Sequence, residues 1–145
     1  MNGRDFLPLA RALAAEATEA AWRSGLSRAY YAAFHVARDL MESLGFAVPK
    51  ADAAHKHMAW RLGNCGDVQV EDVGRKLDIL RGDRNSADYD MRHPMPQTFA
   101  QQRVKMAEQI VQTLEAAALE PTRSQIADAM KLYERDVLQN VTWHP

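Results

Sequence analysis

The chain has 145 residues, 47% of them hydrophobic and 26% charged, which is the composition of one globular domain. Its 18 lysines and arginines nearly balance 19 aspartates and glutamates, so any contact with nucleic acid or a membrane has to be local. The single cysteine, Cys65, excludes an internal disulfide and a multi-cysteine metal site and is consistent with a reducing compartment.

The first third of the chain contains two predicted helices. Apolar residues recur every three or four positions over Phe6–Trp22, Gly25 breaks this pattern, and Ser27 is a suitable cap for a second helix that Gly45 ends. We expect the second helix, over 28–44, to be central and the most buried, because it is apolar around much of its circumference. Its main apolar stripe consists of Tyr30, Phe34, Ala37, Met41 and Leu44.

The N-terminus has neither a signal-peptide nor a transit-peptide pattern. Arg4 and Asp5 precede its apolar residues, and Glu16 and Glu19 follow them. No apolar run approaches the ~20 residues that a membrane-spanning helix needs. We therefore expect a soluble, cytoplasmic protein without a membrane segment.

The middle of the chain is predicted to contain two further helices. Residues 46–52 form a connection, a short helix covers 53–62, and Gly63–Gly66 form a loop. A longer helix is expected from Glu71 to Arg84 or slightly beyond. Met91–Pro96 is predicted to be a turn, in which the two prolines restrict the backbone.

The last third has two more helical patterns. Gln97–Ala118 is a clear periodic segment of about six turns. Glu120–Pro121 separates it from Thr122–Gln139, whose heptad-like apolar stripe either docks on the core or is available to a partner. No segment alternates like a strand and nothing repeats, so we predict an all-α protein with a helical bundle over 1–119 and a C-terminal amphipathic helix and tail over 120–145.

Polar side chains concentrate in the stretch Arg81–Pro94, where the apolar pattern of the preceding helix stops. One interpretation is an ordinary helix end, with basic residues near the last carbonyls, Asp88 spaced to pair with Arg84, and Pro94 as the stop. The other interpretation is a functional site. Composition alone does not separate the two.

Metal and nucleotide-loop chemistry have little support in the sequence. His55 and His57 are two residues apart, which on a helix points their side chains about 200° apart, whereas helical metal ligands are three or four residues apart. The glycines fit no common phosphate-binding loop, and no nucleophile elbow is present. We predict neither a metal nor a cofactor.

Two segments together resemble the HEPN superfamily, in particular its small stand-alone bacterial and archaeal members. The first reads S-R-A-Y-Y-A-A-F-H over Ser27–His35, and the second reads R-N-S-A-D-Y-D over Arg84–Asp90, with His55 between them. The resemblance covers residues 5 to 118. It implies an up-and-down bundle of four to five helices that pairs as a homodimer, with the C-terminal helix as an addition.

The resemblance also implies an activity on RNA. Active HEPN ribonucleases bring two copies of an R-x4-6-H motif into one cleft and cut RNA without a metal, leaving a 2′,3′-cyclic phosphate. Members commonly serve as toxins paired with antitoxins, often beside a minimal nucleotidyltransferase, and in phage defence. Arg84 followed by Asn85 fits the first half of this motif, but Tyr89 stands where the motif has its histidine, and the next histidine is His93.

We assign candidate roles on this basis. Cleavage of RNA requires a cation for the phosphate and groups that transfer protons. The candidate catalytic residues are Arg84, Asn85 and His93, and the candidate substrate-binding residues are Arg81, Asp88, Tyr89, His55 and His35. We expect Arg84, Asn85, Asp88, Tyr89 and His93 to line a polar groove near the dimer axis. The two hypotheses are a metal-independent endoribonuclease or ribonuclease-like toxin, and a non-catalytic module that binds RNA, a nucleotide or a nucleotidyltransferase partner.

Overall fold

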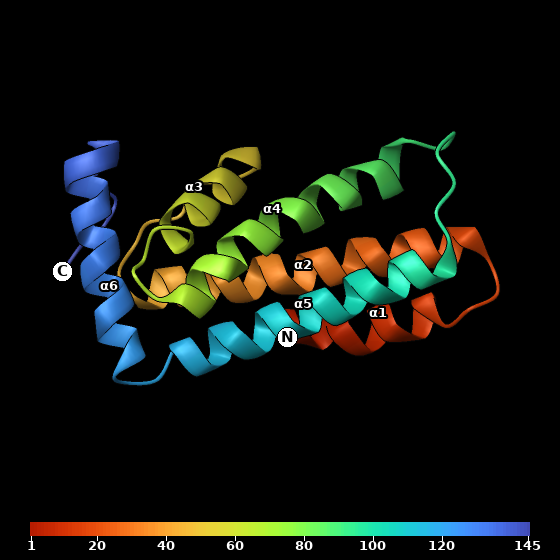
Figure 1. Cartoon of the computed structure of the whole chain (residues 1–145), viewed down its shortest axis with the longest axis horizontal. Coiled ribbons are helices and arrows are strands. Elements are labelled where there is room, and N and C mark those ends of the chain that lie inside the picture. The colour runs from red at the N-terminus through yellow and green to blue at the C-terminus, as the bar shows by residue number, and fades with distance from the viewer.

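The computed structural model describes residues 1–145 and consists of helices joined by short connections (Figure 1). The helices are α1 (Phe6–Ala14), α2 (Glu19–Ser43), α3 (Asp52–Leu62), α4 (Val68–Tyr89), α5 (Gln97–Ala117) and α6 (Thr122–Tyr133). A 3₁₀ turn at Gly3–Asp5 precedes α1, and a π-helical turn at Glu134–Leu138 follows α6. The prediction of an all-α protein is confirmed, since the only β-type pairing is an isolated bridge between Phe46 and Trp143.

Four of the helices form an up-and-down bundle with α2 at its centre. Helices α1, α2, α4 and α5 run alternately in opposite directions, while α6 stands across one end of the bundle (Figure 1). α2 packs against α1, α4 and α5, and its buried alanines let these helices approach closely. All six helices contribute side chains to one continuous core. The central position predicted for the second helix agrees with this arrangement.

The predicted boundary between the first two helices was wrong. The break lies at residues 15–18, and Thr18 caps α2 by accepting a hydrogen bond from the Ala21 amide (3.3 Å). Gly25 is inside α2, where a Cβ atom would lie 2.9 Å from the Ala10 carbonyl oxygen. The glycine therefore serves the close contact between α1 and α2 rather than ending a helix, and Ser27 is not a cap.

Helix α4 is longer than predicted at both ends. It begins at Val68, where the Asp67 carboxylate accepts a hydrogen bond from the Val70 amide (3.0 Å), and a buried arginine caps its last turn. The Arg23 side chain from α2 is only 8% exposed and donates hydrogen bonds to the carbonyls of Ser86 (3.1 Å) and Ala87 (3.0 Å). It also donates to the carbonyls of Asp90 (3.0 Å) and His93. Arg23 thus binds two carbonyls in the last turn of α4 and two in the turn that follows it, which stabilises the end of the helix at Tyr89.

The C-terminal segment docks on the bundle. The Ile126 and Met130 side chains of α6 are fully buried in the main core, whereas Val137, further along the same predicted stripe, is 63% exposed. Beyond α6 the tail returns toward α2: the Ala47 amide donates to the Thr142 carbonyl (3.0 Å) and the Trp143 indole donates to the Leu44 carbonyl (3.0 Å). The docked alternative is the one that the structure shows.

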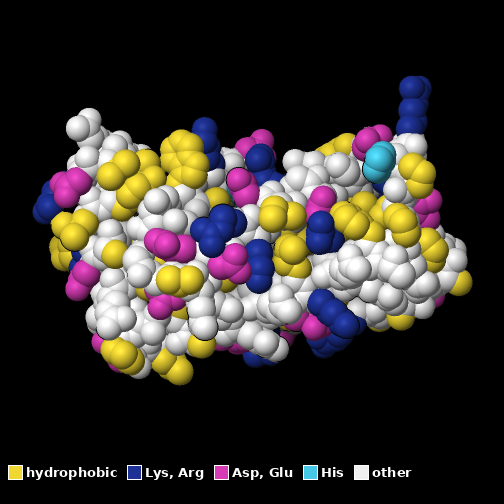
Figure 2. Space-filling view, in the orientation of Figure 1, with side chains coloured by type: hydrophobic (Ala, Val, Ile, Leu, Met, Phe, Trp, Pro, Cys, Tyr) yellow, Lys and Arg dark blue, Asp and Glu magenta, His cyan; other side chains and the backbone are white.

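The other two helices agree with the sequence. The bounds predicted for the short helix and for the long fifth helix match α3 and α5 to within one residue. None of the helices combines the length and the apolarity that crossing a membrane requires. Basic and acidic side chains are interspersed over the face shown in Figure 2, in keeping with the balanced composition.

Candidate functional site

A cleft of about 260 Å³ opens where α2, the start of α3 and the second half of α4 meet. We call it the Arg84 cleft. The polar and aromatic residues that line it are Tyr30, Tyr31, Phe34 and Arg38 from α2, Asp52 and His55 from α3, and Arg81 and Arg84 from α4. The two arginines of α4 are three residues apart and so share a face, which directs both guanidinium groups to the same hollow.

Arg84 is held by aromatic rings rather than by a close carboxylate. Its guanidinium carbon lies 5.2 Å from the Tyr30 ring centroid and 5.4 Å from that of Tyr31, within the range of cation–π attraction. The side chain is 13% exposed, and its buried Nε has no hydrogen-bond partner. The nearest carboxylate, Asp88, is 3.6 Å away, which is longer than a hydrogen bond. The cation is thus positioned but incompletely satisfied.

His55 is engaged at both ring nitrogens. The Asp78 carboxylate can only accept, so His55 Nε2 donates to it (2.9 Å) and the Tyr30 hydroxyl donates to His55 Nδ1 (3.0 Å). Burial, and then the positive charges of Arg81 and Arg84, lower the pKa of His55 against the opposing effect of Asp78. Burial also raises the pKa of Tyr30 to about 12. His55 therefore fixes the tyrosine on which Arg84 rests, and neither group is a free base.

Asp88 is the one acidic group of α4 beside Arg84, and it is oriented by α2. Its Oδ2 atom accepts a hydrogen bond from the Ser27 hydroxyl at 3.1 Å. Because Ser27 is 3% exposed, this bond joins the two helices at the edge of the cleft. The carboxylate weakens the positive field of Arg84 without closing a hydrogen bond to it.

Comparison with known proteins identifies the family. The model of the HEPN domain matches residues 2–117, which include every residue of the cleft. The chain belongs to the HEPN family. Searches of curated proteins and of solved structures gave no match. HEPN domains are associated with ribonuclease and nucleotide-binding roles.

The structure of this HEPN domain brings together only part of the predicted site. Arg81, Arg84 and His55 line the cleft, and Asp88 contacts Arg84. Asn85 follows Arg84 and is half-buried. These five residues remain predictions as far as function is concerned, because their positions alone assign no chemistry.

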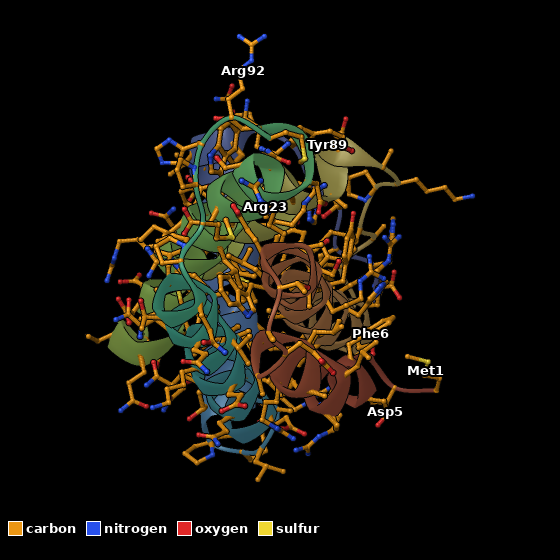
Figure 3. All side chains as sticks on the ribbon, turned by 90° about the vertical axis from the view of Figure 1, so that its right-hand side faces the viewer. Met1, Asp5, Phe6, Arg23, Tyr89 and Arg92 are labelled. Atoms are coloured by element: carbon orange, nitrogen blue, oxygen red, sulfur yellow. The ribbon has the colours of Figure 1, made fainter.

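Tyr89 and His93 lie outside the cleft, at the end of α4. The Tyr89 side chain is 76% exposed, and Figure 3 shows it with Arg92 at the outer edge of the molecule, beyond Arg23. His93 is exposed as well, and its carbonyl is one of those that Arg23 binds. In a single chain these two side chains therefore do not line the groove that we expected them to share with Arg84.

His35 lies beside the cleft without lining it. It is half-buried on α2, with its ring 6.1 Å from that of Phe6 and 6.2 Å from that of Tyr31. Gly3 makes this packing possible, since a Cβ atom there would lie 2.5 Å from the His35 Cβ. His35 is thus linked to the Arg84 cleft through Tyr31.

No group of three or more histidine, cysteine, aspartate or glutamate side chains is placed to hold a metal ion. His57, which the sequence places next to His55, faces the C-terminal tail instead, with its Nε2 atom 3.0 Å from the Thr142 hydroxyl. His55 therefore contacts α2 and α4 at the cleft, whereas His57 contacts the C-terminal tail.

Three arginines at or near the site were missed, and one of them, Arg38, lines the cleft itself. Arg23 is a helix cap drawn from a distant part of the chain, for which the sequence gives no local signal. Arg28 stacks on Phe6 and Tyr31, at 5.6 Å and 5.2 Å from their ring centroids. Its spacing of three residues from Tyr31 on a predicted helix was a signal that could have identified this contact.

Proposed function

We propose that this HEPN protein acts on RNA and that Arg81 and Arg84 bind a phosphate of the RNA backbone in the Arg84 cleft. The observation that carries the proposal is the Arg84 guanidinium, which two tyrosine rings fix at the wall of the cleft and whose nearest carboxylate is 3.6 Å away. A planar guanidinium binds phosphate through paired N–H donors, which makes it the residue suited to such a site.

The surroundings of Arg84 support this assignment. Arg81, one turn earlier on α4, lines the same cleft and forms no ion pair, and Arg38 adds a third cation to the lining against the one carboxylate of Asp52. The chain as a whole has a formal net charge of −1, so attraction to RNA has to come from local groups of this kind. Tyr31 and Phe34 offer apolar walls beside these cations.

For the reaction we propose metal-independent endoribonucleolytic cleavage by a homodimer. Arg84 stabilises the charge on the phosphate, Asn85 donates a hydrogen bond, and His93 transfers a proton. Because His93 lies outside the cleft of its own chain, this scheme needs a second copy whose α4 end approaches the cleft. The setting would be a cytoplasmic toxin–antitoxin or phage-defence system, with an antitoxin or a minimal nucleotidyltransferase as partner.

A non-catalytic binding module is the second candidate, and one observation favours it. The only histidine that lines the cleft, His55, is buried and bonded at both nitrogens, so no free histidine faces the phosphate site within one chain. Tyr89, in the place of the motif histidine, is a weak base at neutral pH. In this case the same cleft holds RNA or a nucleotide without cutting it.

Binding and cleavage assays on the purified protein separate the candidates. We expect Arg84→Ala to weaken binding of a fluorescent single-stranded RNA roughly 10- to 100-fold, the loss of a charged hydrogen bond. Arg75→Ala is the matched control, because Arg75 is on the same helix but is exposed and paired with Asp72 at 3.5 Å.

The same samples test the reaction. Cleavage that persists in EDTA and is lost in Arg84→Ala, at an unchanged melting temperature, supports the endoribonuclease. Binding without cleavage supports the module. If Arg84→Ala binds RNA as tightly as Arg75→Ala does, the assignment of the cleft is wrong.

A further inference from the structure

Arg28 is a half-buried cation without an anionic partner. Its guanidinium carbon lies 5.6 Å from the Phe6 ring centroid and 5.2 Å from the Tyr31 ring centroid, so the two rings hold its plane. It forms no ion pair or hydrogen bond with the rest of the chain. A guanidinium has five N–H donors, and here the protein uses none of them.

Outside the Arg84 cleft, the other recessed arginines of the bundle are satisfied. Arg23 binds Glu19 and several carbonyls, Arg38 donates to Glu42 (3.0 Å), and Arg103 pairs with Asp83. The nitrogens of Arg28 stay accessible from outside, since none of them is a buried atom without a partner, while the two rings restrict the side chain and remove part of its hydration. An unpaired, ring-held guanidinium is therefore a place where an external anion gains more than it does at an exposed arginine.

Arg28 is adjacent to the Arg84 cleft. The Tyr31 ring is shared, with Arg28 at 5.2 Å and Arg84 at 5.4 Å from its centroid. The two guanidinium carbons are consequently no more than about 10.6 Å apart, the sum of these two distances. Figure 3 shows Phe6, the other ring under Arg28, at the side of the molecule below the end of α4 that carries Tyr89.

We propose that Arg28 is a second phosphate subsite, and that the ligand of this face is a single-stranded RNA whose successive phosphates contact Arg84 and Arg28. This inference rests on the proposed function of the Arg84 cleft. Both cations are recessed beside aromatic rings, at 13% exposure for the Arg84 side chain and half-buried for Arg28. A flexible single strand can adapt its backbone so that neighbouring phosphates contact both recessed guanidinium groups. A stiff A-form duplex holds its phosphates at fixed positions on a cylinder.

The dependence of affinity on salt counts the phosphates that are bound. Each phosphate neutralised on a single strand contributes about 0.7 to the slope of log K against log salt concentration. We expect Arg28→Ala to weaken binding of a short single-stranded RNA roughly 10-fold and to lower this slope by about 0.7. Arg75→Ala removes the same charge from an exposed, paired position and should leave the slope unchanged.

A nucleoside monophosphate, AMP, tests whether the two subsites are distinct. AMP has one phosphate, so Arg84→Ala should weaken its binding while Arg28→Ala should not. Circular dichroism and thermal melting check that each variant is folded, and Arg28→Lys is a second variant that keeps the charge but lacks the planar fork. We expect Arg28→Lys to keep the salt slope and to lose part of the affinity.

The outcomes distinguish this inference from the proposed function. If Arg84→Ala weakens RNA binding while Arg28→Ala matches Arg75→Ala in affinity and slope, the second subsite is overturned and the Arg84 cleft stands. If Arg28→Ala weakens AMP binding as much as RNA binding, Arg28 belongs to the first site and the inference is also overturned. Equal affinity for the same RNA annealed to its complement would refute the assignment to single strands.

Discussion

Arg61 and Arg84 are both largely buried, and they differ in which groups meet their charge. Arg61 on α3 is 2% exposed, and its Nε donates to the Glu134 carboxylate (2.6 Å), which is completely buried. Arg61 also donates to the His57 carbonyl (3.1 Å). Arg84 on α4 has two rings, one distant carboxylate and an Nε without a partner.

The difference separates a structural ion pair from a binding site. Glu134 accepts further hydrogen bonds from the amides of Thr142 (2.9 Å) and Trp143 (3.1 Å), so both charges of the Arg61–Glu134 pair have fixed partners within the chain. At the Arg84 end the rings fix the direction of the cation but leave hydrogen-bonding capacity for something else. Burial alone therefore does not distinguish the two arginines, whereas the count of satisfied donors does.

The largest effect is expected from the carboxylate that pairs with Arg61. Glu134→Gln keeps the volume but leaves Arg61 buried without a counter-charge, which costs about 3–5 kcal/mol of unfolding free energy. Urea unfolding followed by circular dichroism measures it. Asp136→Asn, in the exposed pair with Arg135, is the control and should cost less than about 1 kcal/mol. Equal costs for the two variants would remove the contrast between the two arginine environments.

A smaller loss of stability is expected at Arg23, a second buried arginine whose donors are satisfied. Arg23→Gln removes the charged donors that cap the end of α4, and we expect a cost of about 2–3 kcal/mol, the value of a hydrogen bond to a charged group together with carbonyls left unpaired. Hydrogen exchange should show the amides near Ala87 opening first. Protection that is lost uniformly over the bundle would mean that Arg23 does not act as a local cap.

Local sequence patterns predict most of the helices but not these partnerships. The periodic segments of α3 and α5 are visible in the sequence because each buries one face. Arg61 and Glu134 are 73 residues apart in the sequence, and nothing in either neighbourhood indicates that they meet. Gly25 was misjudged for the same reason, since its role depends on the approach of the Ala10 backbone from another helix.

The candidate site shows the same limit. The short motifs identify Arg84 as a residue of interest, and the structure places it beside Arg81 and His55. Sequence spacing does not reveal that α4 continues to Tyr89 and carries this side chain away from the cleft, because the cap that prolongs the helix comes from α2. Long-range contacts, rather than local propensity, thus decide which predicted residues share the cleft.

Acid should affect the Arg61 end through His57. Burial, and then the charge of Arg61, lower the pKa of His57 to about 4, against the opposing effect of Glu134. A histidine with a lowered pKa in the folded state is protonated more readily when unfolded, so stability is complete above about pH 6.5 and falls as the pH drops toward 4.

Titration of His57 alone changes the free energy of unfolding by at most about 1.4 kcal/mol per pH unit. Urea unfolding between pH 7 and pH 4.5 should show a flatter profile for His57→Gln, whose side-chain amide can still donate to Thr142 but does not titrate. Protonation of Glu134 affects stability only at lower pH. Burial raises the pKa of this carboxyl, but the hydrogen bonds from Thr142 and Arg61 outweigh burial and lower the pKa below the ordinary 4.5. Parallel profiles for the two proteins would exclude His57 as the acid-sensitive group.

The smallest effect on stability is expected from the carboxylate beside Arg84, and it gives the sharpest contrast with Glu134. Asp88→Asn keeps an acceptor for the Ser27 hydroxyl and removes only a charge 3.6 Å from Arg84 near the surface, so unfolding should change by less than about 0.5 kcal/mol. Affinity for single-stranded RNA should instead rise about two- to five-fold, because phosphate no longer competes with a neighbouring carboxylate. Replacing a carboxylate by its amide would then destabilise the protein beside Arg61 and strengthen RNA binding beside Arg84. A loss of stability comparable to that of Glu134→Gln, without a gain in RNA affinity, would show that Arg84 is satisfied by Asp88 after all and that its cleft is structural.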